Sequence, residues 1–314
     1  MKPPRLVLVL SENHTLVPAR DLRALVDVAA EAERAGFDGV MVSEHIVLGR
    51  GADADGVPEN PRDYALPGNQ DPVTPWPSSL LLLAAIASVT TRLRLIASAV
   101  IPPLRHPLLI AKELATLDLL SRGRLVVQPT VSWHRAEYEA LGVAFETRGA
   151  RLDEHLAAWT LLWRDSPASF HGTHYAFDDV WLEPKAYRPD GPRLWFGGQR
   201  LHDPLLRRLA EHGHGFNPLG RAGEDDLERL SAAMAAAGRE IAEIEMVGGT
   251  RGAFPDATHP APLEGALDQI PEQVARGFTT ICIKPSQFTD DPSEIPELLV
   301  RIVDGVAARV HSIV

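Results

Sequence analysis

The sequence predicts a single-domain (β/α)8 TIM barrel over residues 1–314. Short runs rich in β-branched residues alternate with longer segments of helical period, which is the pattern of a parallel sheet surrounded by helices. About eight such strand–helix units can be counted, as a closed barrel of this type requires. The hydrophobic share of 45% and the charged share of 23% are those of an ordinary globular protein, so a full core is expected.

The predicted strands and helices follow one another in regular order. Strands are expected at residues 6–10, 38–42, 93–99, 124–128, 193–196, 214–217, 243–247 and 279–284. Helices are expected at residues 20–35, at 79–89 with a cap at Ser78 or Ser79, and at 108–120, 134–141, 151–163, 204–211, 225–237, 263–276 and 295–310. In the first helix, Leu22, Leu25 and Ala29 recur at helical spacing, and Gly36 then ends it.

Three segments interrupt this order and are predicted to be insertions. Residues 46–77 follow the second strand and are rich in Gly, Pro and Asp, so we expect a mobile cover over the site. Residues 169–182 follow the fourth helical region and alternate in the manner of strands, which places them outside the barrel. Residues 248–262 form a third insertion, a loop after the seventh strand.

Charge and composition exclude several classes of function. The formal net charge is −11 without a basic run, so no nucleic-acid partner is expected. The apolar run at residues 6–10 is too short for a signal peptide or a membrane span, and the one cysteine, Cys282, has no disulfide partner. We therefore expect a cytoplasmic protein without membrane contact. Pairs of closely spaced histidines lack a nearby carboxylate or thiol, so no metal is expected either.

In this fold, the C-terminal ends of the strands and the loops after them carry function. The residues at these ends are Ser11, Glu12, Asn13, His14, Ser43, Glu44, His45, Ser98, Gln128, Thr130, Ser132, Trp133, Gly197, Gly198, Gln199, Asn217, Thr250, Arg251, Lys284, Ser286 and Gln287. His45 either exchanges a proton with a cofactor ring or substrate or is a structural histidine held by a backbone carbonyl. Gly197 and Gly198 either bring backbone amides to a phosphate or form a tight turn.

Several segments between residues 37 and 198 form an ordered series. They are FDGVMVSEH at 37–45, RLRL at 92–95, LRHP at 104–107, SRGR at 121–124, WHRAEY at 133–138, FHG at 170–172 and WFGG at 195–198. In order and spacing, this series resembles the luciferase-like monooxygenase superfamily. LRHP and FHG resemble its F420-dependent oxidoreductase branch.

The resemblance implies a barrel enzyme that uses either reduced coenzyme F420 or reduced FMN. It implies that His45 lies near the cofactor ring, and that Gly197 and Gly198, with Gln199 beside them, lie near the cofactor phosphate. It also implies a non-proline cis peptide near Ser98 and Ala99, at the cofactor site. Because members of the superfamily often dimerise, we expect a homodimer.

The fourth strand departs from the family pattern. Where many members have Gly-x-Gly, this chain has the run QPTVS, which begins at Gln128. Trp133 stands where F420 enzymes of the family have a catalytic glutamate. We expect Gln128, Thr130 and Ser132 to take part in cofactor binding, with hydroxyl groups replacing the amide that Pro129 lacks.

These expectations combine into a leading hypothesis with open alternatives. We predict hydride transfer between reduced F420 and a small organic substrate, with His45 and Trp133 framing the ring as the catalytic residues. One alternative is an FMN-dependent monooxygenase that uses reduced FMN and O2. Another is a non-catalytic flavin-binding barrel. A metal-dependent hydrolase is disfavoured, because the first strand does not end in a pair of histidines.

Overall fold

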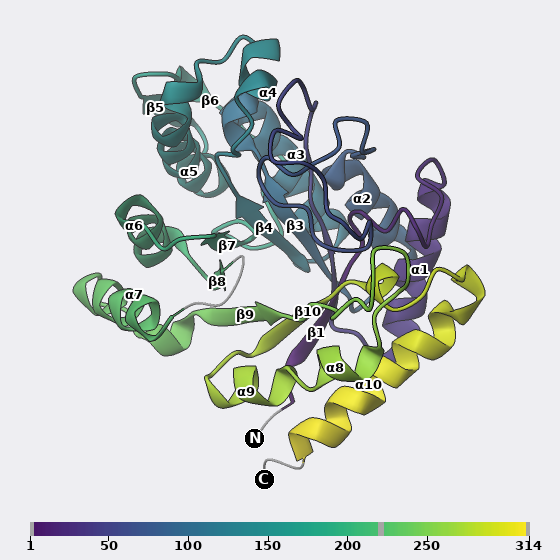
Figure 1. The fold of residues 1–314 in the computed structure, drawn as a ribbon. Helices are drawn as coiled ribbons and strands as arrows, with labels where there is room; N and C mark the ends of the chain where they lie inside the picture. The colour runs from purple at the N-terminus through teal and green to yellow at the C-terminus, as the bar shows by residue number, and fades with distance from the viewer. Residues whose placement is uncertain (1–2, 219–222, 312–314) are drawn as a thin grey trace.

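The computed structural model describes residues 3–218 and 223–311, so residues 1–2, 219–222 and 312–314 of the predicted domain lie outside it. Within that part of the chain, eight parallel strands close into a barrel in the order β1-β10-β9-β8-β7-β4-β3-β2 (Figure 1). They are β1 (Arg5–Val9), β2 (Gly39–Val42), β3 (Arg94–Val100), β4 (Leu125–Pro129), β7 (Arg193–Gly198), β8 (Gly215–Pro218), β9 (Glu245–Gly249) and β10 (Thr280–Ile283). The predicted TIM barrel is confirmed.

Helices surround the barrel, and the last one packs against the first (Figure 1). The α-helices are α1 (Leu22–Ala35), α2 (Ser79–Val89), α3 (Pro107–Leu120), α4 (Arg135–Ala140), α5 (Arg148–Arg164), α6 (Asp203–His212), α7 (Glu224–Ala236), α8 (Leu263–Leu267), α9 (Ile270–Ala275) and α10 (Ile295–His311). Single 3₁₀ turns lie at Pro102–Leu104, Phe145–Thr147, Ile241–Glu243, Pro285–Gln287 and Pro292–Glu294. In the described part of the chain, no helix is long and apolar enough to cross a membrane.

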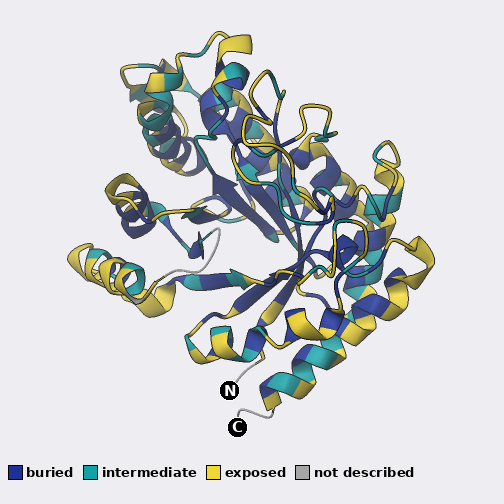
Figure 2. Ribbon diagram, in the orientation of Figure 1, coloured by how far each residue is buried: buried dark blue, intermediate teal, exposed yellow. Residues whose placement is uncertain are grey.

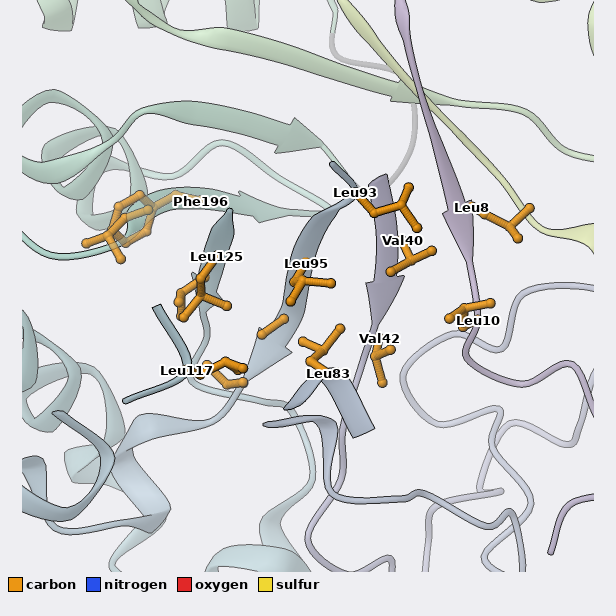
Figure 3. Packing of buried hydrophobic residues seen from close by; sticks show 14 of the residues in the cluster. Leu8, Leu10, Val40, Val42, Leu83, Leu93, Leu95, Leu117, Leu125 and Phe196 are labelled. Carbon is orange, nitrogen blue, oxygen red and sulfur yellow. The ribbon is translucent and has the colours of Figure 1, made fainter. Parts of the chain in front are cut away.

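Alternate residues of each strand point to opposite sides of the barrel wall. One set of side chains fills the barrel interior: Val7, Val9, Met41, Ile96, Val126, Trp195, Val247 and Cys282. Their neighbours in the chain, among them Leu8, Val40, Leu95 and Phe196, face the helices and form the larger core (Figure 3). This period of two is what a sheet buried on both faces requires, and Figure 2 shows β3 and β4 mostly in the dark blue of buried residues.

Two details of the predicted helices differ from the structure. The predicted helix over residues 263–276 is two short helices, α8 and α9, because Pro271 has no amide hydrogen and its ring would clash with the carbonyl group of Leu267. Ser78 occupies the N-cap position of α2, but its side chain makes no capping hydrogen bond. The hydroxyl of Ser79 instead donates to Glu44, 2.9 Å away. Gly36 does end α1, with a left-handed φ of 104°.

Outside the barrel, β5 (Ala168–His171) and β6 (Ala176–Val180) pair as an antiparallel hairpin beside α5. The chain between β2 and α2 runs over residues 43–78, and we call it the covering loop. It is tied to the loop after β9: Asn60 donates to the carbonyl oxygens of Asp256 and His259, each at 2.9 Å. Asp63 forms an ion pair with Arg251 of the same loop. The covering loop is therefore held from the far side of the barrel mouth.

Candidate active site

A cavity of about 660 Å³ opens at the C-terminal ends of the strands. This volume lies within the range of about 300–1,000 Å³ that is usual for small-molecule sites. Of the residues predicted for the site, the following line the cavity: His45, Ser98, Ala99, Gln128, Thr130, Ser132, Trp133 and Gln199. The structure therefore brings most of the predicted site together at one place, as the parallel arrangement of the strands requires.

His45 lies just past the end of β2, and its ring is held on one edge. The imidazole Nδ1 is 3.2 Å from Oε2 of Glu137, a fully buried side chain of α4. The Nε2 atom has no hydrogen-bond partner among the described residues, and His45 lines the cavity. The ring is therefore fixed through one nitrogen and keeps the other for a ligand.

Two tryptophans stand edge-on to the imidazole of His45. The ring of Trp76, at the end of the covering loop, is 5.2 Å away at an angle of 72°. The ring of Trp133, after β4, is 5.9 Å away at 82°. Both line the cavity and offer flat apolar walls beside a titratable nitrogen.

A polar network forms the base of the cavity. The carbonyl oxygen of the Gln128 side chain accepts from Ser98 Oγ and from Asn217 Nδ2, each at 2.9 Å, which joins the ends of β3, β4 and β8. The amide nitrogen of Gln128 donates to no described residue and is left for a ligand oxygen. The peptide between Ser98 and Ala99 is cis, as the family resemblance implied.

Thr130 and Ser132 lie on the turn between β4 and α4. Ser132 has a left-handed backbone with φ of 57°, and its hydroxyl is 3.3 Å from Oε2 of Glu137. Its amide is 3.5 Å from Oγ1 of Thr130. The Ser132 hydroxyl therefore donates to a partner in the protein and can still accept, and its contact with the cofactor stays a prediction.

Gly197 and Gly198 are part of β7, which extends two residues beyond the predicted strand, and neither lines the cavity. A Cβ atom at Gly197 would be 1.9 Å from the carbonyl oxygen of Asn217. Gly197 therefore lets β7 and β8 approach each other closely. Gln199, directly after the pair, is the residue that reaches the cavity. The contact of these glycines with a phosphate stays a prediction.

Buried charged groups lie at and near the cavity wall after β1 and β10. Glu12, after β1, has a left-handed φ of 56° and lines the cavity without a hydrogen-bond partner in the described chain. Burial raises the pKa of Glu12, against the opposing effect of nearby Lys284 and His45. Burial lowers the pKa of Lys284, whose Nζ donates to the carbonyl oxygen of Asp63 at 3.0 Å. The ring of Tyr64 packs against the ammonium group of Lys284, and burial raises the pKa of the Tyr64 hydroxyl well above its usual value.

Sequence reasoning missed three of these residues: Glu137, Trp76 and Tyr64. Glu137 stood inside the WHRAEY segment, in the first turn of the helix that follows β4, so its position in a family motif was an available signal. Trp76 and Tyr64 come from the covering loop, where nothing in the local pattern fixes the direction of a side chain.

The donors around the cavity suit a planar heteroaromatic ligand better than a metal. Among residues 3–218 and 223–311, no group of three or more His, Cys, Asp or Glu side chains is arranged to hold a metal ion. The aromatic walls, the free amide nitrogen of Gln128 and the free Nε2 of His45 match a ring that has flat faces and polar edges. Gln70 and Thr250, which also line the cavity, each carry a buried oxygen without a partner among the described residues.

Comparison with known proteins places the chain in a family of enzymes. An FMNH2-dependent dimethylsulfone monooxygenase of Pseudomonas putida is 30% identical over 214 residues, which is 66% of this chain and 53% of that enzyme. An uncharacterized protein of Mycobacterium tuberculosis is 28% identical over 68% of this chain and 70% of its own length. This chain thus spans about half the length of the first of these relatives.

Solved structures share the whole fold. An F420-dependent secondary alcohol dehydrogenase in complex with an F420–acetone adduct matches with a TM-score of 0.71 at 15% identity, over 98% of this chain and 99% of that one. A type II Baeyer–Villiger monooxygenase of Pseudomonas putida in complex with FMN matches with a TM-score of 0.70 at 16% identity, over the same shares. The sequence profile described as luciferase-like monooxygenase matches residues 5–288. This chain therefore belongs to the luciferase-like monooxygenase family.

Proposed function

We propose that this enzyme is a two-electron oxidoreductase that binds a flavin-type cofactor in the cavity at the strand ends, with reduced F420 as its hydride donor toward a small organic substrate. The observation that carries the proposal is the setting of His45, whose Nδ1 is held by a buried carboxylate and whose Nε2 is free in a cavity of about 660 Å³ between two tryptophan rings. Such a cavity holds a tricyclic ring system.

Each wall has a distinct task in this proposal. Trp133 and Trp76 pack against the ring system or the substrate, and the covering loop keeps water out of the cavity. The amide nitrogen of Gln128 donates to a carbonyl oxygen at the polar edge of the ring. Toward a carbonyl substrate, His45 Nε2 first takes up a proton from water and then gives it to the substrate oxygen, which becomes negatively charged when the hydride adds to the carbon. Reduced F420, when bound, supplies the hydride, whereas reduced FMN supplies electrons to O2.

A specific observation favours the second candidate, an FMN-dependent monooxygenase. The relative that is 30% identical over 66% of this chain is itself an FMNH2-dependent monooxygenase. Against this, the LRHP and FHG segments support F420 as the first candidate. The two candidates differ in whether O2 is consumed, so they can be separated directly.

Binding of FMN and of F420 to the purified protein, measured by calorimetry in parallel titrations, tests the proposal. We expect F420 to bind, and reduced F420 to be oxidised in the absence of O2 when a suitable carbonyl compound is added. Tight binding of FMN alone, with turnover only in the presence of O2, would replace the first candidate by the second. Binding of neither cofactor would contradict the proposed function.

A pair of tryptophan variants locates the binding site. Trp133→Ala removes a wall of the cavity and is expected to weaken cofactor binding by roughly 10-fold or more, because a lost aromatic stacking contact is worth about 1–3 kcal/mol. Trp181→Ala is the matched control, since Trp181 is 65% exposed and does not line the cavity. Equal losses of affinity in the two variants would place the ligand elsewhere.

A further inference from the structure

Glu137 is a buried carboxylate that holds His45 at Nδ1 but does not itself line the cavity. It lies in the first turn of α4, and its side chain is fully buried. Its Oε1 accepts from the backbone amides of Ile46 at 2.5 Å and Val47 at 3.4 Å, and its Oε2 faces His45 Nδ1 at 3.2 Å and Ser132 Oγ at 3.3 Å. One carboxylate therefore joins the start of the covering loop, the turn after β4 and the imidazole.

The partners of Glu137 determine which nitrogen of His45 carries the proton. A carboxylate only accepts hydrogen bonds, so the imidazole must donate to it from Nδ1. In the neutral ring the proton is then absent from Nε2, which becomes an acceptor that faces the cavity. A histidine without such a partner is free to exchange its two tautomers.

We infer that Glu137 is a positioning residue, which holds the neutral ring of His45 in the tautomer that presents Nε2 to the cavity as a proton acceptor. The backbone amides of Ile46 and Val47 make this possible, because they hold the carboxylate at a fixed place beside the ring. The catalytic consequence rests on the proposed function. The tautomer itself does not, because it is set by protein groups alone.

Replacement of Glu137 by glutamine tests the tautomer at almost constant volume. A glutamine has one acceptor oxygen and one amino group in place of two acceptors. Its oxygen is expected to stay with the backbone amide of Ile46, which cannot change from donor to acceptor. Its amino group then faces His45, whose Nδ1 must accept, so that the proton moves to Nε2.

Nitrogen-15 NMR of the imidazole rings, at about pH 8 where an ordinary histidine is neutral, measures this directly. The signals of His45 are assigned by their loss in the His45→Gln variant. We expect the proton on Nδ1 in the unmodified protein and on Nε2 in Glu137→Gln. Glu139→Gln, an exposed carboxylate in the same helix, is the matched control and should leave the ring signals unchanged.

Turnover with the cofactor that binds gives the second measurement. Glu137→Gln is expected to lower kcat by roughly 10²-fold or more, the lower end of what a positioned acid or base contributes, while KM changes little. A proton on Nε2 in the unmodified protein, or a proton that stays on Nδ1 in Glu137→Gln, would overturn the inference. A kcat within about 2-fold of the unmodified enzyme would contradict its catalytic consequence, which rests on the proposed function.

The two hypotheses fail separately. If neither FMN nor F420 binds, the proposed function is wrong, and the NMR result still decides the role of Glu137 toward His45. If Glu137→Gln does not fold, the signals of the unmodified protein alone decide the tautomer.

Discussion

Gly197 and Gly198 are neighbours in β7, but an added methyl group would meet very different surroundings at the two positions. At Gly197, it would be 1.9 Å from the carbonyl oxygen of Asn217 and 3.1 Å from Nε2 of Gln128. At Gly198, its nearest neighbour would be Cδ2 of Leu205, at an ordinary 3.8 Å. Neither glycine has a left-handed backbone, so alanine at the two positions differs only in packing.

The cost of Gly197→Ala follows from these distances. Moving the contact from 1.9 Å to at least 3.0 Å requires β7 and β8 to separate by about 1.1 Å (3.0 − 1.9). Inserting a methyl group into a packed core costs about 1–3 kcal/mol. The same shift weakens the hydrogen bond of 2.9 Å from Asn217 to Gln128, worth about 0.5–1.5 kcal/mol. We therefore expect a loss of about 1.5–4.5 kcal/mol.

Gly198→Ala is the matched control. Here the methyl group fits, and restriction of the unfolded chain is expected to stabilise the protein by about 0.4–1 kcal/mol. Thermal and urea unfolding, followed by circular dichroism, measure both variants. Gly197→Ala should unfold several degrees below the unmodified protein. Equal stability of the two variants would refute the close approach between the strands. A loss of cofactor affinity in Gly198→Ala without a loss of stability would support the predicted phosphate contact.

Two further predictions concern buried polar groups. Both oxygens of Glu44 contact Arg105, at 2.7 and 3.0 Å, so Glu44→Gln should lower the free energy of unfolding in urea by about 3 kcal/mol. Glu146→Gln, at an exposed ion pair, is the control and should leave the free energy of unfolding unchanged. Equal urea midpoints of the two variants would contradict this. Burial lowers the pKa of His155 to about 4, against backbone hydrogen bonds to Arg151 and Arg105 that favour the charged ring. The pKa of a histidine in the unfolded chain is about 6.5, so the unfolded state binds a proton first as the pH falls, and the free energy of unfolding should drop by roughly 3 kcal/mol from pH 6.5 to 4. In His155→Asn, the Tm should depend less on pH over this range. Parallel plots of Tm against pH for the two proteins would count against the buried neutral ring.

The barrel could be predicted from the sequence because each strand carries its own signal. In β1, β3 and β4, runs of consecutive apolar residues such as LVLV at 6–9 and LVV at 125–127 show burial on both faces, and the helices between them are marked by period and by glycine. The break between α8 and α9 could also have been predicted, since Pro271 is visible in the sequence. One continuous helix was predicted there because the residues on both sides of the proline follow a helical period.

The site was predictable only where residues follow strands directly. His45, Ser98, Gln128 and Trp133 line the cavity because strand ends converge in a parallel barrel. Glu137 was not predicted, because its contact with His45 spans 92 positions in the chain and depends on how α4 is placed relative to the residues after β2. Contacts of this kind are set by packing between elements, which the local pattern of a single sequence does not contain.

The contacts between the covering loop and the loop after β9 bear on how the substrate specificity of this enzyme can change in evolution. The two loops face each other through Asn60 and Asp63 on one side and His259 and Arg251 on the other, almost 200 positions apart in the chain. A shorter or longer loop on one side would remove the anchor of the other. New specificities are therefore expected to arise by paired changes in both segments, and a chimera that exchanges only one of them should bind its donor's substrate poorly.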